Sequence, residues 1–264
     1  MDLQLTGKTA LVSGSTVGIG FAIASTLARE GATVIVNGRT QERVDEAIAR
    51  MLRDNPGAKL RGAAADLSTA QGVERVSAAI HDVDILINNI GAFEAKPFFE
   101  IPDADWDHMW ELNVMSGVRL TRRYMPGMLS RNWGRVIFIS SESALNLPAD
   151  MLHYGVTKTS QLGLTRGLAE LTVGTAVTVN AVLPGPTRTE GNMEWMTGLA
   201  KLKGIPVEEA EKNFFANDRP SSLIRRFAEP SEVAAVVAFV ASPRGALTNG
   251  AAIRAEGGII HSIG

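Results

Sequence analysis

The residues best suited to chemistry lie between Ser140 and Lys158, in a hydroxyl-rich stretch that ends in Tyr154-Gly-Val-Thr-Lys158. On a helix, a spacing of four residues places the Tyr154 phenol and the Lys158 ammonium on the same face. A fixed cation favours the phenolate, so we expect Lys158 to lower the pKa of Tyr154 from its usual value of about 10. Tyr154 would then donate or accept a proton at neutral pH. The alternative is an ordinary amphipathic helix with both side chains on its surface.

Short Val- and Ile-rich runs alternate with helical patterns along the chain that carries this pair. The predicted strands are 9–13, 33–36, 60–65, 84–87, 135–140, 176–180 and 251–255. The predicted helices are 19–30, 41–53, 69–81, 103–116, 118–131, one that ends near 171, and 231–241 with Ser231 as its cap. Strands that each lead into a helix build a parallel sheet covered on both faces. We therefore predict an α/β fold of three layers, αβα, with a doubly wound, seven-stranded, mainly parallel sheet.

The alternation breaks between about 187 and 226, where Met193, Trp195, Met196, Phe214 and Phe215 are mixed with charged residues. This segment is too long for a plain connection and too apolar for disorder. No Pro-, Gly- or Ser-rich linker interrupts the rest of the pattern. We therefore treat 1–264 as one domain with an insertion at about 187–226.

A glycine cluster occupies the turn between the first predicted strand and the first predicted helix. It reads Gly14-Ser15-Thr16-Val17-Gly18-Ile19-Gly20. Backbone N–H groups at the start of a helix bind phosphate groups, and glycines let the ligand approach closely. The spacing is GxxxGxG rather than GxGxxG. The position at the first turn of a βαβ unit nevertheless favours a dinucleotide.

The end of the second predicted strand discriminates between the two nicotinamide cofactors in such folds. An acidic residue there binds the ribose 2′-hydroxyl, whereas an Arg accommodates a 2′-phosphate. This sequence has Val36-Asn37-Gly38-Arg39-Thr40, with no acid and one Arg. Arg39 favours NADP(H). The alternatives are a solvated turn arginine and an NAD(H)-dependent protein.

Composition excludes several other classes of function. The net charge of −2 gives no basic footprint for nucleic acid or for an anionic membrane. Zero Cys removes thiolate catalysis and Cys-ligated zinc and fits a reducing compartment. The four histidines have no ligand spacing, so we predict no metal site. Without a signal-peptide pattern or a membrane-length apolar run, we expect a cytoplasmic protein.

The motifs occur together in the order of one known family. They are the glycine loop, Asn88-Asn89-Ile90-Gly91, Asn113, Ser141 thirteen residues before Tyr154, Tyr154-x-x-x-Lys158, Asn180 and Pro184-Gly185. The chain resembles the short-chain dehydrogenase/reductases in their compact single-domain branch, over nearly its whole length. Each motif alone is weak, but the ordered set is specific. The resemblance implies a Rossmann fold and hydride transfer between a nicotinamide cofactor and a carbonyl or alcohol substrate.

The resemblance also implies roles for matching positions. Tyr154 would be the general acid or base, Lys158 would bind the nicotinamide ribose and lower the Tyr154 pKa, and Ser141 would bind the substrate oxygen. Asn113 would hold, through an exposed carbonyl or amide, a water that links Lys158 to solvent. The cofactor contacts would be Gly14, Ser15, Thr16, Val17, Gly18, Ile19, Gly20, Arg39, Asp66, Leu67, Asn89, Gly91, Pro184, Gly185, Thr187 and Thr189, together with Tyr154 and Lys158. Val17 stands where NADP-dependent members often carry Arg or Lys, so the NADP(H) prediction depends on Arg39.

The substrate end of the site is less defined by the sequence. Segment 187–226 matches the mobile lid of the family, where its apolar side chains would form a pocket wall or else pack as core or at a subunit contact. Glu142, next to Ser141, either points to solvent or contacts the substrate. The resemblance suggests a 3-oxoacyl-type substrate, with an NAD(H)-dependent alcohol or sugar dehydrogenase as the alternative.

Two other classes of protein on related folds are disfavoured by the sequence. A non-catalytic dinucleotide sensor would be expected to lose Tyr154 or Lys158, and this chain keeps both. A sugar-nucleotide epimerase or dehydratase would usually carry a larger C-terminal domain. The resemblance implies a homo-oligomer, a tetramer or dimer, built on the helices around 103–131 and 152–171.

Overall fold

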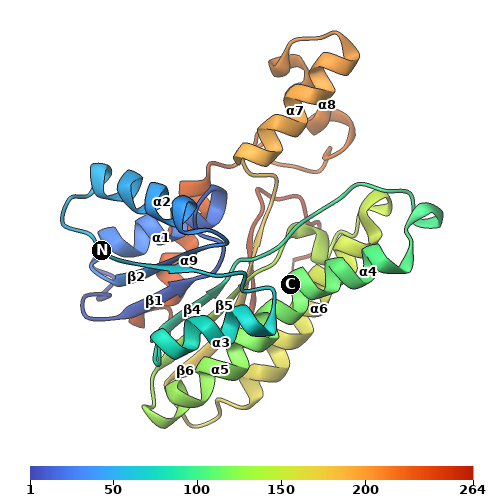
Figure 1. The fold of residues 1–264 in the computed structure, drawn as a ribbon. Coiled ribbons are helices and arrows are strands. Elements are labelled where there is room, and N and C mark those ends of the chain that lie inside the picture. The colour runs from blue at the N-terminus through green and yellow to red at the C-terminus, as the bar shows by residue number, and fades with distance from the viewer. Residues whose placement is uncertain (264) are drawn as a thin grey trace.

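A computed structural model describes residues 1–263 and shows a parallel sheet between two layers of helices (Figure 1). The strands are β1 (Thr9–Val12), β2 (Thr33–Gly38), β3 (Lys59–Ala64), β4 (Ile85–Asn88), β5 (Gly134–Ile139), β6 (Val177–Pro184) and β7 (Ala252–Ala255). Their order is β3-β2-β1-β4-β5-β6-β7, and every neighbouring pair is parallel. The predicted doubly wound, three-layer fold is confirmed, with a sheet that is parallel throughout.

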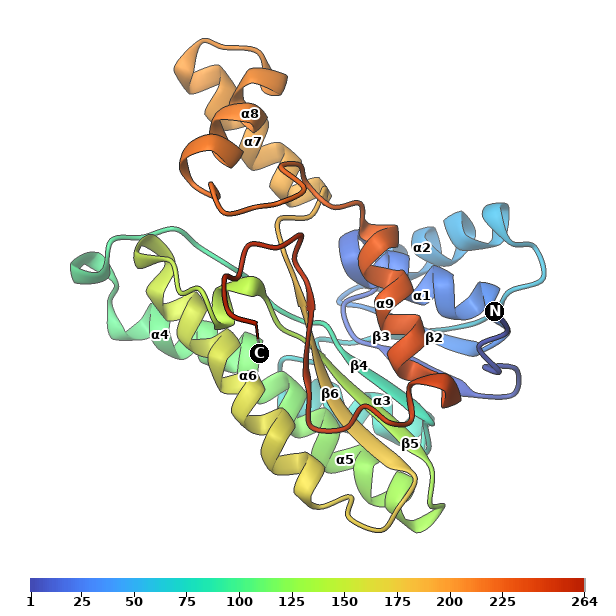
Figure 2. The same cartoon turned by 180° about the vertical axis from the view of Figure 1, so that it is seen from behind.

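The helices of residues 1–263 lie on both faces of this sheet or in the segment 187–226. They are α1 (Gly18–Arg29), α2 (Gln41–Asp54), α3 (Ala70–Ala79), α4 (Asp103–Trp110), α5 (Ser116–Ser130), α6 (Leu152–Glu170), α7 (Glu190–Lys203), α8 (Val207–Asn217) and α9 (Pro230–Ala241). From behind, α1, α2 and α9 lie on one face and α3 to α6 on the other (Figure 2). Alternating side chains of a strand therefore enter two separate cores, as Val12 and Leu11 of β1 do.

The strand order determines where a ligand can bind. β1 lies between β2 and β4, so the chain reverses its direction of winding at β1. Ligands of open α/β sheets bind outside the carboxyl ends of the strands at such a switch point. The turns that follow β1, β4 and β5 carry Gly14, Asn89 and Ser141, so these residues share one edge of the sheet.

The two helices predicted at 103–116 and 118–131 form one continuous helical segment. A π-helical turn, Glu111–Met115, joins α4 to α5 without a break. Asn113 lies inside this turn and is buried. π turns within helices are frequent at functional sites, because the extra residue changes where a side chain points.

Segment 187–226 is more regular than the sequence indicated, since it contains α7 and α8. The two helices stand away from the sheet (Figure 1) and share a small core that includes Met196 and Phe215. The bidentate ion pair of Arg188 with Glu211, at 2.7 and 2.9 Å, fixes the base of this helical pair. We call residues 187–226 the lid.

The predicted cap of the last helix is wrong by two residues. Helix α9 begins at Pro230, and Glu229 is its N-cap. Glu229 and Glu232 form a reciprocal capping box, which satisfies the backbone N–H groups of these two residues. Ser231 lies within the first turn, because Pro is well suited to the first helical position.

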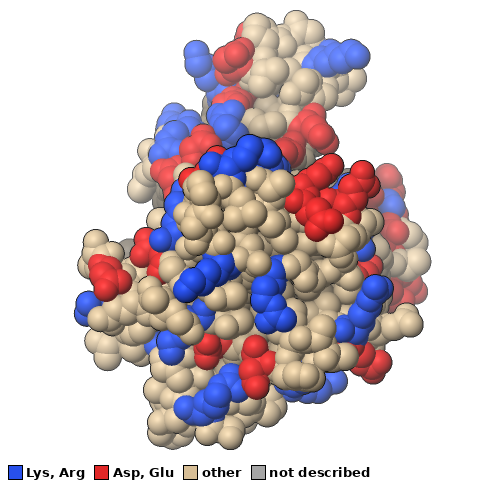
Figure 3. All heavy atoms as spheres, turned by 60° about the vertical axis from the view of Figure 1, so that its left-hand side comes forward, with Lys and Arg blue, Asp and Glu red and all other residues tan. Residues whose placement is uncertain are grey.

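The surface is chemically mixed on the face that carries α1 and α2. Lys and Arg side chains are interspersed with Asp and Glu there (Figure 3). Within residues 1–263, no helix is long and apolar enough to cross a lipid bilayer.

Gly72 provides a test of the packing at the start of α3. A Cβ atom at this position would lie 1.8 Å from the Asp66 carbonyl oxygen. The substitution Gly72→Ala should therefore lower the free energy of unfolding by about 1–3 kcal/mol, as overpacking does. Gly167→Ala in α6 is the matched control, because nothing lies within 4 Å of its Cβ position and Ala favours helix. Urea unfolding of both variants measures the difference, and equal stabilities would contradict this packing.

Candidate active site

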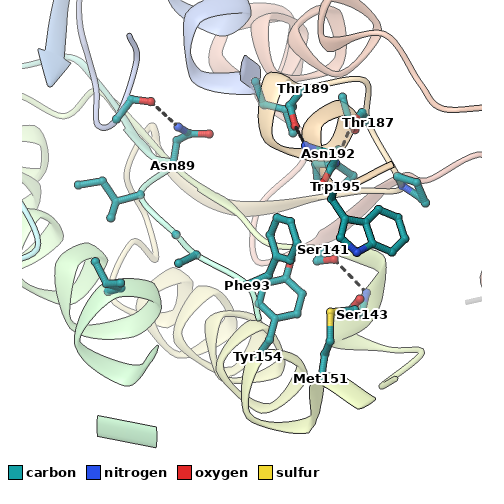
Figure 4. Close-up of a pocket in the computed structure, with 18 of the residues that line it drawn as sticks. Asn89, Phe93, Ser141, Ser143, Met151, Tyr154, Thr187, Thr189, Asn192 and Trp195 are labelled. Carbon is teal, nitrogen blue, oxygen red and sulfur yellow. Dashed lines mark hydrogen bonds between the residues drawn. The ribbon is translucent and has the colours of Figure 1, made fainter. Parts of the chain in front are cut away.

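The carboxyl edge of the sheet opens into a cleft of about 1250 Å³ that runs from the glycine loop to the lid. Its lining includes Thr16 and Arg39 at one end, and Ser141, Tyr154 and Trp195 at the other. Figure 4 shows Tyr154, Ser141 and Trp195 facing the same space from three different elements. The cleft therefore joins the predicted cofactor residues to the predicted catalytic residues.

Three polar side chains hold the glycine loop in shape. The Ser13 hydroxyl accepts hydrogen bonds from the backbone N–H groups of Asn89 and Ile90, at 2.9 and 3.2 Å. Asn89 Nδ2 donates to the carbonyl oxygens of Ser13 and Gly14, each at 3.0 Å. Asn37 Oδ1 accepts from Gly14 N at 3.0 Å. Asn37 and Asn89 therefore fix the loop, a role indicated beforehand only by their place at strand ends.

The loop fits a pyrophosphate on the evidence of its own contacts. Gly14 and Gly18 have φ values of +62° and +58°, which favour glycine. At Gly20 a Cβ atom would lie 2.4 Å from the Gly14 carbonyl oxygen, so that position also requires glycine. The Gly18 N–H, at the start of α1, donates to the Glu190 carboxylate at 3.0 Å. An anionic oxygen therefore already binds where a phosphate oxygen of a dinucleotide would.

Ser15 differs from the other predicted loop contacts. Its side chain is buried, donates to the Val12 carbonyl oxygen at 2.7 Å and accepts from Asn37 N at 2.9 Å. Like Gly18, it is absent from the lining of the cleft, whereas Thr16 and Val17 belong to it. The Ser15 side chain supports the loop from below, and the contact of this residue with the cofactor stays a prediction.

The adenosine end of the cleft carries two guanidinium groups. Arg39 follows β2 and lines the cleft as predicted, and Arg43 lines it one helical turn later. Asp66 and Leu67 lie opposite, after β3. Arg43 was not predicted as a cofactor contact; it lies in the first turn of α2, which begins two residues after Arg39.

Tyr154 and Ser141 meet at the other end of the cleft. Tyr154 lies in the first turn of α6, and Ser141 follows β5 and caps the turn Glu142–Ala144 by accepting from Ser143 N at 3.1 Å. The Phe93 ring packs edge-on against the Tyr154 ring, with centroids 6.2 Å apart (Figure 4). The hydroxyls predicted to bind the substrate oxygen thus share one wall.

The pKa of Tyr154 moves in the opposite direction to the one expected. Burial raises the pKa of Tyr154 to about 12, while hydrogen bonding to Ser141 acts the other way. Burial likewise lowers the pKa of Lys158 to about 8. Lys158 Nζ donates to the Ile139 carbonyl oxygen at 2.9 Å and lies 5.7 Å from the centroid of the phenol ring. The predicted lowering of the Tyr154 pKa by Lys158 is therefore wrong for the chain by itself, because desolvation dominates.

Asn113 and Lys158 lie directly beneath the cleft. A Cβ atom at Gly91 would lie 3.2 Å from Asn113 Oδ1 and 3.3 Å from Lys158 Nζ, so glycine lets the three meet. The Asn113 amide exchanges two hydrogen bonds with the backbone of Ala92, and its own carbonyl oxygen accepts from Gln161 Nε2. The expectation of an exposed Asn113 carbonyl or amide is wrong, because both groups are buried and bound internally.

The loop after β6 brings the remaining predicted contacts into the cleft. Pro184, Gly185, Thr187 and Thr189 all line it. Gly185 is required there, because a Cβ atom would lie 2.7 Å from the Glu256 carbonyl oxygen. Thr189 caps α7 by accepting from Asn192 N, so the loop passes directly from the cleft into the lid.

Glu142 is buried and does not point to solvent. Its Oε1 accepts from Arg219 Nε at 2.9 Å and from the Ser143 hydroxyl at 3.3 Å. Arg219 belongs to the lid, so this ion pair joins the lid to the wall that carries Ser141. Burial raises the pKa of Glu142, and the charge of Arg219 opposes that shift.

Some apolar side chains of the lid pack in a core, and others form a wall of the cleft. Met196 and Phe215 are buried in the core that α7 and α8 share. Trp195 and Leu199 line the cleft, and Phe214 belongs to both. The lid therefore has its own core and also supplies an apolar wall. In the described part of the chain, no group of three or more His, Cys, Asp or Glu is placed to hold a metal ion.

Comparison with known proteins identifies the family. The family model described as short chain dehydrogenase matches residues 8–199. The uncharacterized oxidoreductase YvaG of Bacillus subtilis is 49% identical over 263 residues and covers 100% of both chains. The 3-oxoacyl-(acyl-carrier-protein) reductase FabG of Aquifex aeolicus is 32% identical and covers 98% of this chain and 100% of that one.

The fold agrees with the same assignment. L-sorbose reductase from Gluconobacter frateurii, complexed with NADPH and L-sorbose, superimposes with a TM-score of 0.93 at 31% identity and covers 100% of both chains. Family match, sequence identity and the cleft geometry point to one class of chemistry. The chain belongs to the short-chain dehydrogenase/reductase family and is an NAD(P)-dependent oxidoreductase that acts on alcohol and carbonyl groups with a nicotinamide cofactor.

Proposed function

We propose that this protein transfers a hydride between NADP(H) and a small carbonyl or secondary-alcohol substrate, while Tyr154 exchanges the proton. The observation that supports this most directly is the continuity of the cleft. It connects Arg39 and Arg43, the glycine loop, and the paired hydroxyls of Ser141 and Tyr154.

Each side chain of the site has a separate role in the proposed reaction. When bound, the nicotinamide supplies or accepts the hydride. Ser141 donates a hydrogen bond to the substrate oxygen, and Tyr154 holds its proton at Oη, because its raised pKa favours the neutral phenol. Lys158 is an ammonium below about pH 8 and stabilises negative charge that develops on the phenol oxygen. The lid excludes water from the substrate end.

The cofactor preference depends on positive charge at the end of β2. Arg39 and Arg43 both line the adenosine end. Two guanidiniums suit a 2′-phosphate, since charge-assisted hydrogen bonds to phosphate are the strongest available there. The structural relative with bound NADPH supports the same choice. An NAD(H)-dependent alcohol or sugar dehydrogenase is the alternative.

Two relatives support different substrate classes for this protein. The FabG similarity supports a 3-oxoacyl substrate, and the sorbose reductase similarity supports a sugar. A non-catalytic dinucleotide sensor is disfavoured, because Tyr154 and Ser141 both face the cleft. We also propose a homo-oligomer, a tetramer or dimer, formed through α4, α5 and α6, in a cytoplasmic compartment.

The reaction itself is tested with a panel of ketones, 3-oxoacyl thioesters, hydroxyketones and secondary alcohols, each with NADPH or NADP⁺ and followed at the reduced-nicotinamide absorbance band. Tyr154→Phe should lower kcat by about 10²- to 10⁴-fold, because the proton donor is lost. Its affinity for NADPH should stay unchanged. Tyr124→Phe is the matched control, since that phenol donates to the Ile80 carbonyl oxygen in the core. Near-normal turnover by Tyr154→Phe would overturn the mechanism.

The cofactor preference is tested by removing the two guanidiniums. Arg39→Ala and Arg43→Ala should each weaken NADPH roughly 10- to 100-fold, the value of a charged hydrogen bond, and should leave NADH almost unaffected. Fluorescence titration of both cofactors measures the difference. Arg53→Ala, on an exposed part of the same helix, is the control. Equal affinity of the unmodified protein for the two cofactors would refute the NADP(H) proposal.

The two shifted pKa values predict how reduction depends on pH. Tyr154, with a pKa of about 12, stays protonated throughout the working range, whereas Lys158 loses its charge above about pH 8. The kcat/KM for reduction should therefore be flat below about pH 7 and fall up to about tenfold per unit above about pH 8. Oxidation requires the phenolate and should rise with pH over the neutral range. A reduction rate that stays level to about pH 10, with circular dichroism showing folded protein, would contradict these assignments.

A further inference from the structure

The buried carboxylate of Glu142 has one oxygen that the protein leaves free. Oε1 accepts from Arg219 and Ser143, but Oε2 has no hydrogen-bond partner among residues 1–263, although it is shielded from solvent. The Glu142 side chain is 4% exposed. Leaving a buried acceptor unpaired is costly, so such an atom in a pocket wall indicates a partner from outside the chain.

Arg219 offers a complementary free group beside it. Its Nε binds Glu142, and its Nη1 donates to the Asp218 carbonyl oxygen at 2.8 Å. Its Nη2 makes no hydrogen bond to the described residues, and the side chain is 14% exposed. Glu142 and Arg219 both line the cleft next to Tyr154. An unpaired acceptor and an unpaired donor therefore lie on one side of the reaction centre.

Apolar side chains lie around the pair. Met151, Leu147, Trp195 and Phe214 line the same end of the cleft. Of the polar side chains there, Ser143 and Asn192 already donate to other groups of the protein. A small number of convergent polar groups in an apolar pocket fixes orientation and gives specificity. The Glu142–Arg219 pair is placed to do this for a group close to the reacting carbon.

The charges of the pair select the chemistry of that group. Glu142 and Arg219 together carry no net charge. A substrate carboxylate would be repelled by Glu142, and a substrate ammonium would be repelled by Arg219. A hydroxyl both donates and accepts, so it matches Oε2 and Nη2 together without adding charge. A plain alkyl chain would leave Oε2 unpaired.

We propose that Glu142 and Arg219 form a hydroxyl-binding subsite that selects ketones and secondary alcohols carrying a second hydroxyl near the reacting carbon. The preferred substrates are then hydroxyketones and polyols rather than unsubstituted ketones or long acyl chains. This assignment rests on the proposed oxidoreductase function and names its substrate class. Glu142 acts as a specificity-determining residue and takes no part in proton transfer.

Matched substrates test the subsite with the complete protein. The pairs are 1-hydroxybutan-2-one against butan-2-one with NADPH, and butane-2,3-diol against butan-2-ol with NADP⁺. The hydroxylated member of each pair should have the higher kcat/KM, mainly through a lower KM. In Glu142→Gln, the ratio within each pair should fall roughly 10- to 100-fold, because the second oxygen becomes a donor. NADPH affinity should stay close to that of the unmodified protein, and turnover of butan-2-one should fall much less than turnover of 1-hydroxybutan-2-one.

A lid control separates specificity from stability. Glu211→Gln removes the Arg188 ion pair elsewhere in the lid, so it should lower turnover of both members alike and keep their ratio. If Glu142→Gln unfolds in a thermal melt, Arg219→Gln supplies the same comparison from the lid side. An unchanged ratio in the folded variant would overturn the subsite while the oxidoreductase function stands. No turnover of any panel member by the unmodified protein would instead overturn the proposed function.

Discussion

The packing of helix α6 against the end of strand β5 is the interaction on which the active site depends. The Ser140 hydroxyl donates to the Lys158 carbonyl oxygen, and Lys158 Nζ donates back to the Ile139 carbonyl oxygen, each at 2.9 Å. This exchange holds Tyr154 beside Ser141. It also buries the ammonium and leaves the phenol only partly exposed, and desolvation disfavours the charged form of each. The pKa of Tyr154 therefore rises while that of Lys158 falls, which keeps the proton on the phenol.

Most of the fold could be predicted because it follows from local patterns. The strands between β2 and β6 in the sheet are apolar runs that are almost entirely buried, whereas the edge strands β3 and β7 are partly exposed. A turn and a helix follow each strand from β1 to β6. The order of β2, β1 and β4 then places the turns after Ser13 and Asn88 at one edge. Family resemblance supplied the roles of Ser141 and Tyr154, and the cleft brings these side chains together. The lid helices were not predicted. Their apolar residues face both the lid core and the cleft, so the sequence shows no regular helical spacing of apolar positions.

What could not be predicted depends on contacts between distant parts of the chain. Glu142 and Arg219 are 77 positions apart, and no sequence pattern links them. The pKa of Tyr154 was predicted to fall because the sequence shows a nearby cation, but it does not show burial. The loop sequence likewise does not reveal that the Ser15 hydroxyl turns toward β2 and accepts from Asn37 N. Each error arose where a tertiary contact outweighed a local motif.

The lid contacts the two ends of the cleft through groups of opposite charge. At the cofactor end the Glu190 carboxylate accepts from Gly18 N, and at the substrate end Arg219 binds Glu142. Two anions cannot share the Gly18 N–H, so a phosphate bound there, as proposed for the cofactor, would displace Glu190 and weaken that contact of the lid. The Arg219 contact does not compete with a cofactor, because Glu142 belongs to the substrate wall. The position of the lid is then set at one end by what occupies the glycine loop and at the other by the Glu142 carboxylate beside Tyr154.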